Sequence, residues 1–181
     1  MSVEDVFSLR QGRVVMLAGR IERGRVRCGD EVEIVGLGGG ATAHVAGIEE
    51  GRAPVDEAIA GMNVGVLLRD IAADAVARGQ VLAAPGSIAA HTAFTADLTL
   101  WSEEQGGADV VSGDRLRFHT RAAAVWGIVV LPHGIEVVRP LHGGEVTVTL
   151  EEPVALEHGR QFAFRHHSRA AGSGTVTRLP R

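Results

Sequence analysis

Short runs in which apolar and polar residues alternate dominate the first half of the chain. In the segment Glu31–Val35, two glutamates alternate with the apolar residues Val32 and Ile34. Because successive side chains of a strand point to opposite faces of a sheet, we expect Val32 and Ile34 to point inward and both Glu side chains to point to water. Similar patterns predict strands at residues 14–18, 26–28, 31–35, 42–48, 63–68 and 80–83.

These strands are expected to close, or nearly close, into a barrel. About six short strands in an open sheet would leave unpaired edges, and closure removes such edges. Residues 71–78 could form one helical turn at most. The glycine-rich run 36–42 lies between two predicted strands, so it is expected to be a flexible hairpin loop.

The second half of the chain shows the same alternation of apolar and polar residues. In residues 145–150, Val146, Val148 and Leu150 alternate with polar residues and are expected to point inward. Further strands are predicted near residues 92–101, 114–120, 125–131, 161–165 and 173–179. A Pro-Gly pair and small residues interrupt the pattern between the halves. The sequence therefore predicts an all-β protein of two consecutive antiparallel barrels, at residues 1–85 and 92–181, with a linker at 86–91.

The absence of lysine excludes one class of function. All 18 basic residues among the 181 are arginines. A Walker-type phosphate loop needs a Lys that reaches the terminal phosphates, and the Asn-Lys-x-Asp element that reads guanine needs one too. We therefore expect that these residues do not bind GTP. The net charge of −4, spread over both halves, also argues against a broad field that would bind nucleic acid without specificity.

The single cysteine and the hydropathy profile predict a cytoplasmic location. Cys28 alone cannot form an internal disulfide, and before Gly29-Asp30 it is expected at a strand end as a small core residue. No apolar run is long enough to span a membrane, and residues 1–5 lack the basic and apolar segments of a signal peptide. We expect a cytoplasmic protein that does not enter membranes.

Several strings resemble the second and third domains of bacterial elongation factor Tu, in the order in which that family has them. In the first half they are Glu-Asp-Val-Phe-Ser (4–8), Gly-Arg-Ile-Glu-Arg-Gly (19–24), Gly-Asp-Glu-Val-Glu-Ile-Val-Gly (29–36), Asn-Val-Gly-Val-Leu-Leu-Arg (63–69) and Arg-Gly-Gln-Val-Leu-Ala (78–83). In the second half they are residues 85–88, 91–92, 104–107, 131–136 and 162–165. The resemblance covers nearly the whole chain and implies two β-barrels without the GTPase domain that precedes them in the family, in a natural short protein or a truncated one.

The resemblance also implies a binding site. In the family, a cleft between domain two and the GTPase domain holds the aminoacyl end of charged tRNA. The matching residues on the domain-two wall are Glu4, Asp5, Phe7, Glu49, Arg52, Asn63, Val64, Leu67 and Arg78. Carboxylates and an Asn amide suit an α-amino group and the terminal ribose, Phe offers an apolar face, and Arg suits phosphate. The alternative is that these residues only begin strands, serve turns or, as with Glu49 and Arg52, form a surface ion pair.

Two regions depart from the family pattern. Beside the pocket, Ala18 stands where the family has Thr, and Glu50-Gly51 replaces an apolar-aromatic pair. On the surface that contacts the tRNA T stem in the family, residues 121–127 and 165–169 replace hydroxyl and main-chain contacts with methyls, an indole and imidazoles. Trp126 in this surface is either core filler or the anchor of a protein interface, and we favour the interface.

No residue set predicts catalysis or a metal site. Cys28, Ser8 and the histidines form no recognisable arrangement of nucleophile, base and orienting group, so we expect a protein that is not an enzyme and needs no cofactor. His166 and His167 are neighbours that would point to opposite faces of a strand, and no third ligand stands at a suitable spacing.

Two functions remain open from the sequence. The first is an RNA-binding accessory of translation that recognises the 3′ end of aminoacyl-tRNA or docks on the ribosome. The second is a protein-interaction module that pairs with a GTPase domain supplied by another chain, or with a second copy of itself.

Overall fold

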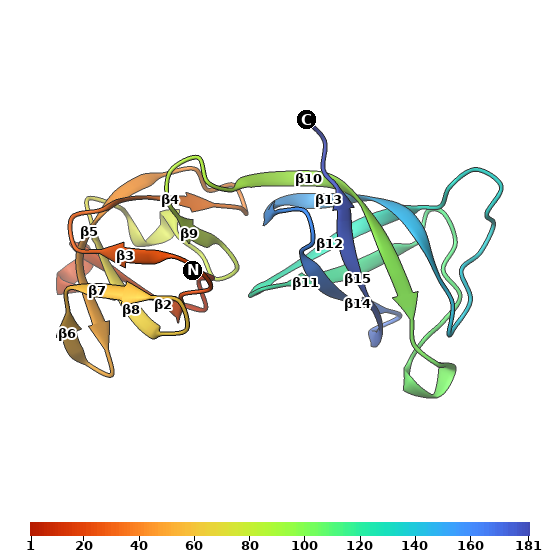
Figure 1. Ribbon diagram of the computed structural model, residues 1–181, viewed down its shortest axis with the longest axis horizontal. Helices are drawn as coiled ribbons and strands as arrows, with labels where there is room; N and C mark the ends of the chain where they lie inside the picture. The colour runs from red at the N-terminus through yellow and green to blue at the C-terminus, as the bar shows by residue number, and fades with distance from the viewer. The chain divides into compact units, whose positions relative to one another are not determined.

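A computed structural model describes all residues, 1–181, and shows an all-β protein (Figure 1). Contacts divide the chain into two compact units, Met1–Ala89 and Ala90–Arg181. The division falls inside the expected linker 86–91, and strand β10 already begins at Ala89, so the last residues of that segment are strand residues.

The first unit is one large sheet with a small two-stranded sheet beside it. Its strands are β1 (Asp5–Leu9), β2 (Val14–Arg20), β3 (Arg25–Arg27), β4 (Glu31–Val35), β5 (Thr42–Glu50), β6 (Ala53–Val55), β7 (Glu57–Ile59), β8 (Asn63–Arg69) and β9 (Val81–Ala83). The large sheet runs β1-β2-β8-β5-β4-β9 with β6 on β5, and β3 pairs with β7. An isolated bridge between Ser2 and Val81 joins the two ends of the large sheet. The unit is therefore a nearly closed barrel, as the strand pattern predicted.

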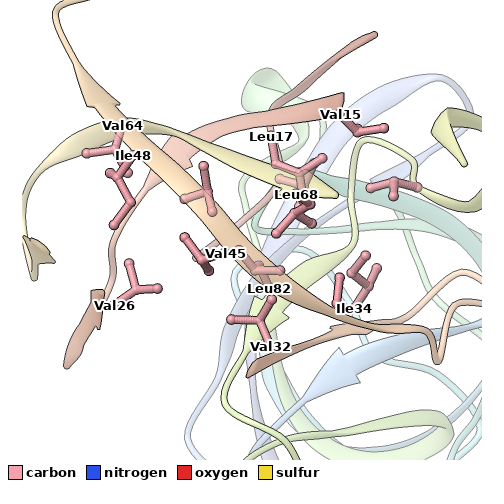
Figure 2. Close-up of a cluster of buried hydrophobic side chains, with 14 of the residues drawn as sticks. Val15, Leu17, Val26, Val32, Ile34, Val45, Ile48, Val64, Leu68 and Leu82 are labelled. Carbon is pink, nitrogen blue, oxygen red and sulfur yellow. The ribbon is translucent and has the colours of Figure 1, made fainter. Parts of the chain in front are cut away.

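The core of the first unit lies between the curved strands. Figure 2 shows apolar side chains from several strands gathered there, including Leu17, Ile34 and Leu68, which are fully buried. Val32 is also buried, whereas Glu31 is exposed and Glu33 partly exposed, so the predicted inward and outward faces of β4 are confirmed. Residues 36–41 connect β4 to β5, which pair antiparallel, and the predicted hairpin loop is therefore confirmed.

Three strands of this unit were not predicted: β1, β6 and β7. The two short ones have three residues each, too few for alternation to show. The burial of β1 does not alternate cleanly along Asp5–Leu9 either. Two short 3₁₀ segments, Arg10–Gly12 and Ala73–Ala75, complete the unit, and the second is the expected single helical turn.

The second unit is a closed six-stranded barrel in the order β10-β13-β12-β11-β14-β15. Its strands are β10 (Ala89–Leu100), β11 (Arg115–Thr120), β12 (Ala123–Val130), β13 (Gly143–Leu156), β14 (Gln161–His166) and β15 (Arg169–Arg178). Val146, Val148 and Leu150 are buried as predicted. Four phenylalanines pack mostly edge to face in the interior, namely Phe94, Phe118, Phe162 and Phe164.

The expected burial of Cys28 is wrong. β3 ends at Arg27, so Cys28 lies in the turn that follows, where it is exposed. Asp30 holds this turn, because its carboxylate accepts a hydrogen bond of 2.9 Å from the Arg27 N–H. The strand end was located correctly, but the side chain at a strand end faces solvent as soon as the chain leaves the sheet.

The remaining helical segment is the 3₁₀ turn Glu103–Gln105, capped by Ser102. No helix in this structure has the length and apolar character needed to cross a bilayer.

Candidate functional site

The outer face of the first sheet carries most of the predicted site residues. Residues that pair directly across antiparallel strands share one face. One such row runs Phe7, Met16 and Leu67 across β1, β2 and β8. The next row runs Asp5, Ala18, Gly65 and Glu49 across β1, β2, β8 and β5. An apolar row thus lies beside a row that has a carboxylate at each end.

A shallow depression of about 370 Å³ opens on this face. Its lining includes five predicted residues, Glu4, Glu49, Arg52, Asn63 and Val64, and also Met16, Ala18, Gly19, Gly51 and Gly65. The strand register therefore brings together side chains that are up to sixty positions apart in the sequence.

The polar groups of the depression are available to a ligand. Glu4, Asn63 and Arg52 are exposed, and Glu49 is partly exposed. The structure contains no ion pair between Glu49 and Arg52, so it does not support the alternative in which these two residues form a surface ion pair. The carboxylate of Glu49 can therefore accept hydrogen bonds from a bound group without first losing a partner.

The floor depends on residues that sequence reasoning missed. A Cβ atom on Gly65 would lie 2.7 Å from the Met16 sulfur, so the thioether of Met16 lies over this glycine. Gly19 is also confined, because a Cβ there would lie 2.0 Å from the Ser2 carbonyl oxygen. Nothing local in the sequence marks Met16 and Gly65 as partners, because only the pairing of β2 with β8 brings them together.

The other predicted residues lie around this depression. Phe7 is 45% exposed, and Asp5 is exposed opposite Ala18. Leu67 and Glu49 line a second hollow of about 310 Å³. Val64 reaches the depression but is mostly buried in the core.

Arg78 does not line the depression and, unlike Asp5, Phe7 and Leu67, does not lie on the strand rows around it. It is exposed in the turn before β9. The next residue, Gly79, donates its N–H to the Val3 carbonyl at 3.0 Å, so Arg78 lies next to the segment that carries Glu4. Its position suits contact with a part of the ligand that extends beyond the depression.

Arg52 occupies a strained position. Gly51 and Arg52 form the two-residue turn between β5 and β6, with φ of 54° and 68°. Both central residues of such a hairpin turn have positive φ, which favours Gly or Asn. An arginine in the left-handed region costs about 1 kcal/mol.

We expect Arg52→Gly to raise the free energy of unfolding by about 0.5–1 kcal/mol, because glycine adopts positive φ without steric cost. Urea unfolding measures this change. Arg13→Gly is the matched control, since Arg13 has φ of −80° and glycine should lower stability there by about the same amount. A loss of stability in Arg52→Gly would mean that the side chain has a structural role.

Comparison with protein families connects the chain to a known architecture. Residues 13–83 match the family model of elongation factor Tu domain 2, and residues 87–180 match that of the elongation factor Tu C-terminal domain. The chain belongs to the elongation factor Tu domain 2 and C-terminal domain families. The resemblance read from the sequence is therefore confirmed, and the chain is a module like those of a translation factor.

In the second unit, Trp126 does not fill the core. Its side chain lies partly exposed on the outer face of β12, since the alternate residues Val125 and Gly127 are the buried ones. The guanidinium of Arg115 lies 4.2 Å from the centre of the indole ring, and that of Arg117 lies 5.4 Å away. An outward indole contacted by arginines remains a candidate interface anchor.

The two neighbouring histidines are arranged differently from the expectation. Their rings stack at 3.9 Å between centroids. They do not point to opposite faces, because His167 has left β14 and lies in the turn with φ of 50°. His166 is buried, 3.6 Å from an Asp114 oxygen, and burial lowers its pKa. No three His, Cys, Asp or Glu residues lie together in a metal-binding group.

Proposed function

We propose that the first unit binds the aminoacyl 3′ end of tRNA as a module of the translation apparatus that performs no catalysis. The observation that carries this proposal is the outward depression in which Glu4, Glu49, Arg52 and Asn63 surround a floor of Met16 and Gly65. The membership of the chain in the elongation factor Tu domain families supports the same assignment.

Each group in the depression has a role in this proposal. The carboxylates of Glu49 and Glu4 accept hydrogen bonds from the α-ammonium group, which is the group that distinguishes charged from uncharged tRNA. The Asn63 amide bonds the terminal ribose. The Phe7–Met16–Leu67 row offers an apolar surface to the amino-acid side chain, and Arg52 and Arg78 meet phosphate groups.

The proposed binding is weak. The depression is open on its outer side, so these residues form one wall only, and a ligand held by one wall keeps much of its contact with water. The entropy of fixing the ligand must still be offset. We further propose that these 181 residues bind no GTP, since they contain no lysine for the phosphate and guanine contacts.

A titration with charged and uncharged tRNA at moderate salt tests the proposal. We expect charged tRNA to bind more tightly, and Glu49→Gln to weaken only that complex, by about tenfold, because a neutral amide bonds the ammonium group less strongly. Glu50→Gln is the matched control, since Glu50 is exposed on the same strand but does not line the depression. Equal binding of both tRNA forms, or an unchanged Glu49→Gln variant, would refute the assignment.

A second candidate function is supported by the outer face of the second unit. Trp126 lies there beside Ile128 and Val130, which are 36% and 50% exposed. An outward indole with exposed aliphatic neighbours is typical of a surface that binds protein. The partner in this case would be a GTPase domain of another chain, a second copy of this chain, or another protein.

A further inference from the structure

Strand β11 presents a row of nitrogen-bearing side chains on the outer face of the second barrel. Arg115, Arg117 and His119 alternate with the buried residues Leu116 and Phe118. On one side β11 pairs with β14, and there Arg165 stands directly opposite Arg117. Two like charges at directly opposite positions of a sheet repel each other, so this pairing lowers stability unless an anion lies between them.

The chain provides no such anion at Arg117. Arg115 is compensated, because its guanidinium bonds both oxygens of Glu151, at 2.6 and 2.9 Å. Arg117 Nε and His119 Nε2 are instead buried without any hydrogen-bond partner. Burial and the charges of Arg117 and Arg165 lower the pKa of His119, and no carboxylate opposes them. Arg117 and Arg165 thus lie opposite each other without a carboxylate of this chain at Arg117, and an external anion would reduce their repulsion.

Small side chains flank His119, and apolar side chains lie beside Arg117 and beyond it. His119 stands between Ala124 on β12 and Ala163 on β14, both of which have small side chains. Trp126 is the β12 residue opposite Arg117. Beyond Trp126, the exposed Ile128 and Val130 continue along the same face of β12.

We propose that this face, formed by Arg117, His119, Arg165, Trp126, Ile128 and Val130, binds an acidic segment of a partner protein. A carboxylate of the segment accepts hydrogen bonds from the Arg117 guanidinium, beside His119 and Arg165. Apolar side chains of the same segment cover Trp126 and its aliphatic neighbours. The site lies in the other unit from the tRNA depression and does not depend on it.

Two features favour a protein segment over RNA. The Arg115 guanidinium lies over the indole of Trp126, on a surface where a base would otherwise stack. The exposed aliphatic side chains of Ile128 and Val130 add nothing to a phosphate contact, whereas their burial against a partner protein stabilises the complex.

The proposal is tested with three probes on the full chain: a fluorescently labelled short peptide of Asp and Glu residues with one Phe, a single-stranded RNA oligonucleotide of similar charge, and inorganic phosphate. We expect the peptide to bind most tightly by fluorescence anisotropy, and Arg117→Gln to weaken it about tenfold, as expected for the loss of a charge-assisted pair. Arg117→Lys should be weaker than the wild type, because an ammonium cannot bond a carboxylate in two places. Trp126→Ala should also weaken the complex.

Controls separate this proposal from a structural role and from the tRNA site. Arg139→Gln removes the same charge from an exposed loop and should leave peptide binding unchanged. Arg117→Gln should melt at the same or a higher temperature, because it removes a charge that repels Arg165. A structural role would lower the melting temperature. Glu49→Gln should not affect the peptide. Tighter binding of the RNA, full competition by phosphate, or unchanged affinity in Arg117→Gln would overturn the proposal.

Discussion

Replacing Phe118 with alanine is expected to lower the free energy of unfolding of the second unit by about 3–5 kcal/mol. Phe118 is 2% exposed, and its ring centre lies 6.1 Å from that of Phe94 and 5.6 Å from that of Phe162. The variant therefore loses both the apolar surface of one ring and its edge-to-face contacts, and it leaves a cavity in a closed barrel that cannot collapse easily.

Chemical denaturation followed by circular dichroism measures this effect. Phe7→Ala is the matched control, because Phe7 is 45% exposed on the first unit and its loss should change stability by no more than about 0.5 kcal/mol. A loss below about 1 kcal/mol in Phe118→Ala would show that the four phenylalanines do not form the central packing of the barrel.

Replacing Asn63 with alanine is expected to weaken the binding of charged tRNA by about 1–3 kcal/mol, which corresponds to roughly five- to 150-fold. Asn63 begins β8 at the rim of the depression and is exposed, so its amide is free to bond a ribose hydroxyl, and its removal should not disturb the core.

The measurement is an equilibrium titration with charged tRNA, accompanied by an unfolding curve for each variant. Thr42→Ala is the control, since Thr42 is an exposed polar residue on β5 that does not line the depression. If Asn63→Ala and Glu49→Gln both keep full affinity, these residues are part of the scaffold only, and the protein-binding role of the second unit becomes the better assignment.

Much of the fold could be predicted because it depends on local patterns. Alternation within β4 and β13 determines which side chains face the core, and a five-residue segment is long enough to show it. The same reasoning could not find β6 or β7, whose three residues show no period. It misjudged Cys28 and His167, because both lie where the chain leaves a strand and the side chain no longer alternates.

The candidate site was predicted from the resemblance to elongation factor Tu, and not from periodicity. Glu4, Glu49 and Asn63 were assigned in this way, and the structure places all three on one depression. Arg78 was assigned in the same way but lies outside that depression, beside the amino-terminal segment. A resemblance transfers residue types to positions, whereas only coordinates show which of them share a surface.

The chain's own residue order was sufficient for the all-β class, the two barrels and the inward faces of the strands. Each of these follows from residue type and from neighbours close along the chain. Strand register is a different kind of information, since it pairs residues that are distant in sequence. It placed Met16 over Gly65. It also set Arg165 opposite Arg117, next to a histidine without a partner. The partners of a strand are selected by the packing of the whole barrel, and for this reason only the folded molecule shows which residues share each candidate binding surface.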